Sequence, residues 1–240
     1  MPLRLTLILR TPNYPLMDHA ADPDPVLIRL REGFERVALV LRADLWAAAG
    51  DAGLNPTQAQ VLALLAGRPA GLRAKEIAAH LAVSAPSMAD TLAALARKAL
   101  LTRAPDPADA RAAIVRLTDE GRALGRALAA ATSQVMSALA RLAPPEQADL
   151  LLTQIKLIRT LQQAGAIPVQ RMCVSCRHFR PNAHPAEAQP HHCAFVNAAI
   201  GTRDLRLDCS EHEAADPDVQ AATWTSFANG SQPLRAPRET

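Results

Sequence analysis

Aromatic residues are scarce in this sequence: phenylalanine, tryptophan and tyrosine together make up 3% of its 240 residues. Alanine and leucine dominate the apolar fraction, and this bias favours a core built mainly from helices. With 49% hydrophobic and 20% charged residues, the composition is that of a globular protein rather than a disordered one. The length fits one large domain, or one domain with a small additional module.

Long hydrophobic runs are also absent. No stretch approaches the ~20 apolar residues that a helix needs to cross a bilayer. The apolar core of residues 1–9 is shorter than that of a secretion signal, and no small-residue cleavage site follows it. We therefore expect a cytoplasmic protein with no membrane partner, in which residues 1–24 form a disordered arm or Met17 is the true initiator.

A strong excess of one charge is missing too. The net charge of +3 permits an acidic partner such as nucleic acid but does not require one. Glycine-rich phosphate loops, a nucleophile elbow and supported pairs of catalytic carboxylates are not found. We therefore do not expect an enzyme.

Apolar spacing predicts a run of helices from residue 25 onward. The first helix ends at Gly50 and Gly53, the second begins at Pro56 and closes at 67–69, and a short helix spans 72–81. A tight turn at residues 82–83 leads to a helix capped by Ser84. The apolar positions that recur at three- and four-residue spacing in the first helix are Leu27, Leu30, Phe34, Val37, Leu41, Leu45 and Trp46. The fourth helix places Met88, Leu92, Leu95 and Ala99 on one face.

The period then changes to that of strands. Residues 100–103 and 113–117 are predicted strands, and the polar segment 105–111 between them is a hairpin loop, or wing. A helix follows from Thr118 to about Ala143, where two prolines break it. The last helix spans 146–164 and carries one apolar stripe, formed by Leu151, Ile155, Ile158 and Leu161.

Helix, tight turn, helix and two-stranded wing form a winged helix-turn-helix. Such a domain places its second helix in the major groove of double-stranded DNA and its wing near the flanking backbone or minor groove. The predicted DNA contacts are Arg73, Ser84, Ser87, Asp90, Thr91, Arg97, Arg103, Arg111 and Arg116.

Five ordered segments resemble the MarR family of transcription regulators. They are residues 54–62, 76–84, 95–103, 106–111 and 117–121, and with the flanking helices the resemblance covers 25–165. It implies a homodimer, joined by its first and last helices, that reads a pseudo-palindromic operator as a repressor. The apolar stripes at 27–46 and 150–161 agree with this interface, although they can instead pack within one chain.

One departure from the family concerns the recognition helix. The family usually has a basic residue where Asp90 stands, and this helix is nearly uncharged before Arg97. A carboxylate at this position can accept a hydrogen bond from cytosine N4, or it can have a purely helical role without touching DNA. DNA affinity should therefore depend strongly on the wing.

All four cysteines fall near the C-terminal end, in the pattern C-x2-C-x16-C-x15-C. In a reducing cytosol such clustering indicates a metal centre before a disulfide, although a thiol–disulfide switch remains an alternative. We predict a four-cysteine metal or cluster module over residues 170–213, followed by a flexible tail over 214–240. Its ligands are Cys173, Cys176, Cys193 and Cys209.

A [4Fe–4S] cluster is favoured over Zn²⁺ because the pattern holds only one close cysteine pair. His191 and His192 adjoin Cys193 and are poorly placed to bind the same ion beside it. The module weakly resembles high-potential iron–sulfur proteins, and that resemblance implies that Phe179, Phe195 and Trp224 shield a cluster from water.

This placement suggests that the regulator senses redox state, nitric oxide or iron, with the helix at 146–164 relaying the signal to the two recognition helices. A second hypothesis combines structural zinc with a small aromatic ligand bound in the dimer cleft. A third, from another functional class, is an electron-transfer or thiol-redox protein.

Overall fold

The computed structural model describes residues 24–131, 133–228 and 230. Residues 1–23 of the arm predicted over 1–24, and the end of the predicted tail, lie outside the described residues. By its internal contacts the chain forms two units, which meet between Leu39 and Val40 inside the first helix.

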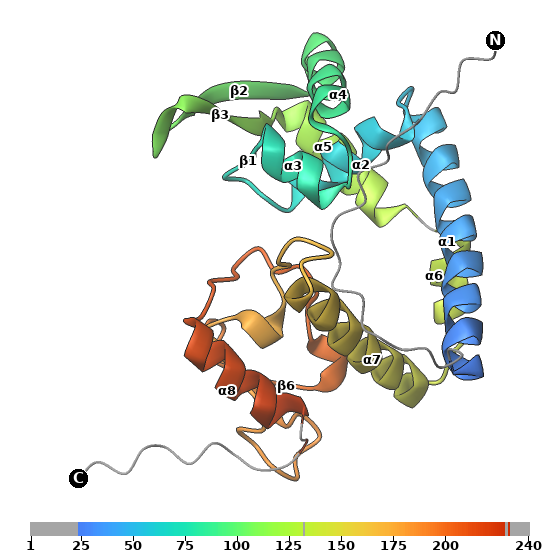
Figure 1. Cartoon of the computed structure of the whole chain (residues 1–240), viewed down its shortest axis with the longest axis vertical. Coiled ribbons are helices and arrows are strands. Elements are labelled where there is room, and N and C mark those ends of the chain that lie inside the picture. The colour runs from blue at the N-terminus through green and yellow to red at the C-terminus, as the bar shows by residue number, and fades with distance from the viewer. Residues whose placement is uncertain (1–23, 132, 229, 231–240) are drawn as a thin grey trace, which may run out of the picture. The chain divides into compact units, whose positions relative to one another are not determined.

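Apart from an additional strand, β1, the first part of the chain has the element order predicted for a winged helix (Figure 1). Strand β1 pairs with β3, and β3 pairs with β2, so the wing is an antiparallel three-stranded sheet. The elements are α1 (Pro25–Asp51), α2 (Pro56–Ala66), β1 (Leu72–Arg73), α3 (Ala74–His80), α4 (Ala85–Arg97), β2 (Leu101–Asp106), β3 (Asp109–Leu117) and α5 (Asp119–Ala130).

Short polar side chains fix where these helices begin. The Asn55 side chain accepts a hydrogen bond from the Gln58 backbone N–H, and the Gln58 side chain accepts one from the Asn55 N–H, which forms a capping box. Ser84 caps α4 by accepting from the Ser87 N–H, as predicted. Ala82, with a φ of +52°, makes the tight turn between α3 and α4.

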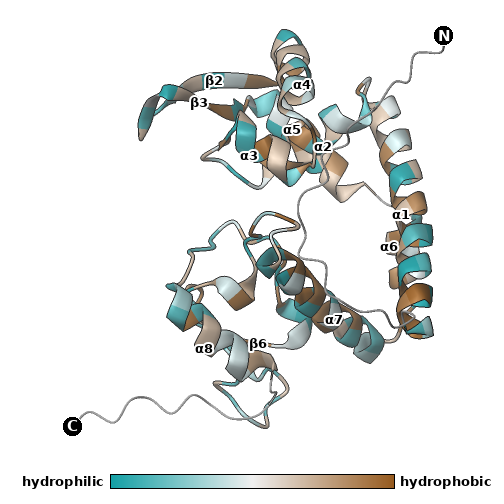
Figure 2. Cartoon of the chain, in the orientation of Figure 1, coloured by the Kyte–Doolittle hydropathy of each residue, from teal (hydrophilic) through white to brown (hydrophobic). Residues whose placement is uncertain are grey.

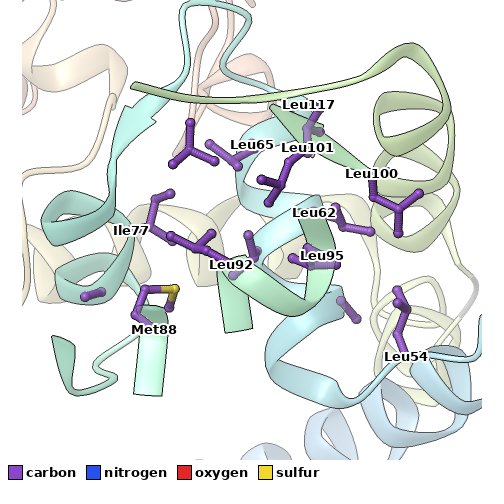
Figure 3. Close-up of a cluster of buried hydrophobic side chains, with 14 of the residues drawn as sticks. Leu54, Leu62, Leu65, Ile77, Met88, Leu92, Leu95, Leu100, Leu101 and Leu117 are labelled. Carbon is purple, nitrogen blue, oxygen red and sulfur yellow. The ribbon is translucent and has the colours of Figure 1, made fainter. Parts of the chain in front are cut away.

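The core of the winged helix is made of leucines that meet from α2, α4 and the wing, together with Ile77 from α3 (Figure 3). Leu62, Leu92 and Leu95 are completely buried, and Leu101 closes the cluster from the wing. At roughly 25 cal/mol per Å² of apolar surface removed from water, this burial is the main force that holds α4 in place.

Helix α5 approaches the rest of the winged helix through two glycines. A Cβ atom added at Gly121 would lie 1.9 Å from the carbonyl oxygen of Leu100, and one at Gly125 would lie 2.6 Å from that of Leu62. No side chain fits at either distance, so glycine is required at both positions.

Several predicted boundaries are wrong. The segment 72–81 begins with strand β1, because Leu72 and Arg73 pair with Val115 and Ile114. The predicted wing loop 105–111 is mostly strand, with a register irregularity at residues 105–106. Ala99 lies beyond the end of α4, exposed and with a φ of +56°, and is not part of the buried face.

The helix predicted over 118–143 is also interrupted. Helix α5 ends at Ala130, and a new helix, α6 (Gln134–Leu139), begins after Ser133. The Ser133 hydroxyl accepts from the Met136 N–H and starts this helix with its own cap.

The C-terminal part of the chain is a small module around a second core. The helix predicted over 146–164 is confirmed as α7, which begins at Pro144. The elements are α7 (Pro144–Gln163), the 3₁₀ turn η1 (Cys173–Ser175), β4 (Phe179–Arg180), β5 (His191–Cys193), β6 (Ala198–Ile200), the 3₁₀ turn η2 (Thr202–Asp204) and α8 (Pro217–Ala228). Strands β4, β5 and β6 form one antiparallel sheet.

Two predictions change in this region. The tail predicted to be flexible from residue 214 contains α8, whose Phe227 is buried against Phe179. The apolar stripe of α7, coloured brown in Figure 2, packs largely within the chain: Ile155 is 1% exposed in the core that also holds Met172 and Val174. Most of this stripe is therefore not free for a dimer interface, although Leu161 at its end is 38% exposed.

Candidate DNA-binding surface and cysteine cavity

The recognition helix α4 divides into a buried side and an exposed side. Met88, Leu92 and Leu95 face the core. Ser84 and Ser87 are exposed, but their hydroxyls lie 2.9 Å apart at the helix start, and Ser84 is occupied as the cap. The Thr91 hydroxyl donates to the Ser87 carbonyl oxygen and can still accept a hydrogen bond.

Asp90 is exposed on α4, and its side chain makes no hydrogen bond or ion pair within the part of the chain that the structure describes. A capping role or an ion pair along the helix is therefore not seen. Its carboxylate is available to accept from an exocyclic amine such as cytosine N4, and that DNA contact stays a prediction.

The predicted arginines fall into two groups. Arg97 at the end of α4, and Arg103 and Arg111 in the wing, are exposed. Arg116 is partly buried, and its Nε donates to the Ala70 carbonyl oxygen. The first three side chains are the ones that can reach phosphates without giving up an internal contact.

Arg73 belongs to the base of the wing. It is ion-paired with Asp106, and its Nη1 lies 3.9 Å from a carboxylate oxygen of Asp109. Asp106 is only 7% exposed and also accepts from the Ala108 N–H. That N–H bond and the Arg73 guanidinium hold the pKa of Asp106 below its usual range. Sequence reasoning missed Asp106, and the signal was an acidic residue directly before the turn of a hairpin.

The four cysteines line one cavity of about 480 Å³. All four are free thiols in the structure. Other lining side chains include Phe179, Phe195 and Arg206, so the walls are partly aromatic and partly polar. The predicted ligands are thus brought together by segments up to 36 residues apart in the sequence.

Local backbone structure positions each thiol. Turn η1 holds the close pair, with the Cys176 N–H donating to the Cys173 carbonyl oxygen. Cys193 lies at the end of β5, opposite Phe179. The Cys209 N–H donates to the Arg171 carbonyl oxygen, and the Arg206 N–H lies 3.3 Å from the Cys173 sulfur.

The spacing of the donors bears on which group would fit. A tetrahedral zinc ion needs four sulfurs at ~2.3 Å from one point. Among the described residues, which include all four cysteines, no three His, Cys, Asp or Glu side chains gather closely enough to hold a single ion. In an iron–sulfur cluster each thiolate binds a different iron atom, so the sulfurs need not meet at one point, and the identity of any bound group stays a prediction.

The electrostatics of the cavity disfavour a bare thiolate at Cys173. Burial raises the pKa of the Cys173 thiol, and the neighbouring cysteines raise it further, because the negative charges of close thiolates repel. The Arg206 N–H acts in the opposite direction. Iron or zinc supplies the positive charge that would allow all four to be deprotonated together.

The surrounding aromatic and histidine residues differ in their roles. Phe179 is 3% exposed and Phe195 is 49% exposed, and both line the cavity as predicted. Trp224 does not line it: its ring lies under the Arg159 guanidinium, 4.6 Å away. His191 is buried beside Phe179 and Phe227 rather than in the cavity.

Together, the helix-turn-helix and the three-stranded wing define a winged-helix domain, of the class that binds duplex DNA. Residues 52–112 match the model of the MarR family, about a quarter of the chain and most of this domain. The match supports the MarR-type interpretation of this segment. No curated protein matches the chain significantly.

Several solved structures are similar to the chain. The transcriptional repressor CouR bound to a 23-mer DNA duplex is 29% identical, with 58% of this chain and 99% of that chain covered and a TM-score of 0.44. CouR from Rhodococcus jostii RHA1 bound to p-coumaroyl-CoA is 23% identical (61% and 94% covered, TM-score 0.45). The S. aureus MepR–DNA complex is 19% identical (58% and 100% covered, TM-score 0.45).

Among the described residues, none of the helices combines the length and apolar character needed to cross a membrane.

Proposed function

We propose that this protein is a MarR-type transcription regulator that acts in the cytoplasm, binding a pseudo-palindromic operator as a homodimer and repressing transcription from it. The observation that carries the proposal is an exposed, polar face on α4 next to a wing with exposed arginines, within the segment that matches the MarR family. Helix α4 reads base edges in the major groove, and the wing binds the flanking backbone.

Arg111 is the residue that tests this mode of binding. It is exposed next to the wing turn, and its backbone N–H donates to Asp109, so the loop is defined without its guanidinium. Arg111→Ala should weaken binding to duplex DNA and lower the slope of log K against log salt by about one, since one phosphate contact is lost.

Arg126→Ala is the matched control, because Arg126 is an exposed arginine on α5 outside the wing. Fluorescence anisotropy with a labelled duplex over a salt series gives both affinity and slope. Equal slopes for the two variants would contradict the proposed wing contact.

The dimer is proposed from the apolar face of α1. In this helix Leu27, Leu30 and Phe34 are each more than half exposed in the single chain. A second copy of the chain that covers this face removes apolar surface from water and pairs two recognition helices, which a pseudo-palindromic site requires.

We also propose that the cysteine cavity holds a [4Fe–4S] cluster and that this cluster makes the regulator responsive to redox state, nitric oxide or iron. The four thiols would be its ligands, and Phe179 and Phe195 would limit the access of water. When bound, such a cluster supplies reversible one-electron chemistry, tuned by hydrogen bonds to its sulfurs such as the one from Arg206 to Cys173. Support comes from the one cavity that all four thiols line.

Anaerobic purification, an absorption spectrum and analysis for iron, sulfide and zinc test the cofactor. We expect brown wild-type protein that contains equal molar amounts of iron and sulfide. The Cys209→Ser variant should lose both. Ser210→Ala, next to that ligand but outside the cavity lining, should keep them. Colourless wild-type protein with one zinc per chain would contradict the cluster and indicate a structural zinc site instead.

A further inference from the structure

We infer that Asp208 couples the cysteine cavity to the DNA-binding domain, an inference that rests on the proposed function. Asp208 directly precedes the predicted ligand Cys209. Its two carboxylate oxygens accept hydrogen bonds from Arg68, at 3.0 Å from Nη1 and 3.1 Å from Nη2. Such a bidentate pair defines orientation as well as distance.

Arg68 lies just after α2, at the end of that helix nearest in sequence to the wing strand β1. Its side chain is 7% exposed, and its Nη1 also donates to the carbonyl oxygen of Leu64 in the last turn of α2. The buried guanidinium therefore satisfies a carbonyl at the helix end and has Asp208 as its anionic partner. Helix α2 packs against both α4 and α5.

Arg171 makes a second connection between the same two regions. Its Nε donates to Asp208 at 2.6 Å, and its Nη2 donates to the carbonyl oxygen of Gly67 at 2.9 Å. Its own carbonyl oxygen accepts the Cys209 N–H. Arg171 is also two residues before Cys173, so two of the four cysteine segments reach the end of α2 through this group.

Because of this arrangement, a movement of Cys209 would also move Asp208, which contacts the end of α2 in the winged helix. A ligand held by a cluster fixes Asp208 beside the end of α2, whereas a released ligand loop is free to move. Movement of Asp208 would leave Arg68 buried without its partner, which costs more than the loss of an exposed ion pair. The end of α2 then rearranges, and α4 moves with it because the two helices share the core.

Hydrogen exchange of the full-length protein tests the coupling, with and without the cluster. In the wild type, cluster loss should increase amide exchange over residues 60–73, and operator affinity should change by roughly 5–150-fold, the usual size of such a coupling. In Asp208→Asn the exchange of 60–73 should no longer depend on the cluster, and the affinity ratio should approach one.

Glu213→Gln is the matched control, because Glu213 is ion-paired with Arg177 and His178 inside the module and makes no side-chain hydrogen bond or ion pair to α2. It should keep the wild-type cluster dependence. If Asp208→Asn does not fold, Arg68→Met/Asp208→Asn removes both charges together and should show the same uncoupling.

The outcomes separate this inference from the proposed function. If amide exchange over residues 60–73 still depends on the cluster in Asp208→Asn, the coupling is wrong. The coupling is also wrong if exchange over 60–73 is the same in wild-type protein with and without the cluster. In both cases the proposed regulator and its cofactor are unaffected. Wild-type protein without iron and sulfide overturns the cofactor and the coupling together.

Discussion

The arginines of the wing have different tasks although their side chains are chemically the same. Arg111 is exposed and without a side-chain partner among the described residues, whereas Arg73 is held by Asp106 at the base of the hairpin. The sequence spacing assigned both to DNA. The pairing of β1 with β3 places Arg73 beside the wing, where it has a structural role. Arg111 has no such contact with the described residues and is free to bind phosphate.

Asp106 should make the stability of the protein depend on acid pH. Its pKa is lowered in the folded state, so its contribution is fully present above the ordinary aspartate pKa of about 3.9 and is lost as pH falls below it. Asp106→Asn should therefore lower the free energy of unfolding at pH 7 and show a shallower decline between about pH 5 and pH 3.

Urea unfolding at several pH values measures this effect. Asp51→Asn, which changes an exposed carboxylate outside the wing, serves as the control. A difference between wild type and Asp106→Asn that stays constant down to about pH 3 would contradict the role given to this carboxylate.

At the level of elements, local signals predicted the helices well and the tertiary contacts poorly. Ser84 and Thr118 marked helix starts because their caps are local. Strand β1 has two residues and exists only through pairing with β3, which is distant in the sequence, so no periodicity could reveal it. Helix α8 was missed because its apolar residues do not recur in a regular stripe along one helix face. The helix is ordered by burying Phe227 against the second core.

The cysteine module shows the same division. The convergence of its four cysteines on one cavity was predictable from clustering alone. Arg68 and Asp208 are 140 positions apart in the sequence, one beside the winged helix and the other in the cysteine module. Their contact depends on tertiary packing, so nothing in the local sequence indicated it.

Gly121→Ala tests the close approach of α5. Its Cβ would overlap the Leu100 carbonyl oxygen, so α5 must shift, and we expect a loss of about 1–3 kcal/mol or more in the free energy of unfolding. Gly50→Ala is the control: no atom lies within 4 Å, and alanine in a helix should be neutral or stabilising by up to about 1 kcal/mol. Equal stabilities of the two variants in urea unfolding would show that α5 is not packed this closely.

At the scale of the whole molecule, two apolar helix faces that looked alike in the sequence are put to different uses. The α7 stripe is used mainly inside the chain, where Ile155 joins the core of the cysteine module. The α1 face remains exposed over much of its length. The dimer proposed here therefore depends mainly on α1.

Phe34→Glu should shift the protein from dimer to monomer and weaken operator binding, because a charge would be buried in the interface. Leu39→Glu is the matched control: Leu39 is 61% exposed on the same helix but lies off the face formed by Leu30 and Phe34. Sedimentation velocity measures the result. A Phe34→Glu protein that stays dimeric would place the interface elsewhere.

The two winged helices of a homodimer are proposed to bind one DNA duplex symmetrically, and the proposed regulation depends on this binding. Selection of binding sites from a random duplex library by the full-length protein measures this directly. We expect an enriched pseudo-palindrome whose half-sites are centred about 10–10.5 base pairs, one helical turn, apart. Failure to enrich any sequence, or enrichment of a single unrepeated half-site, would contradict it.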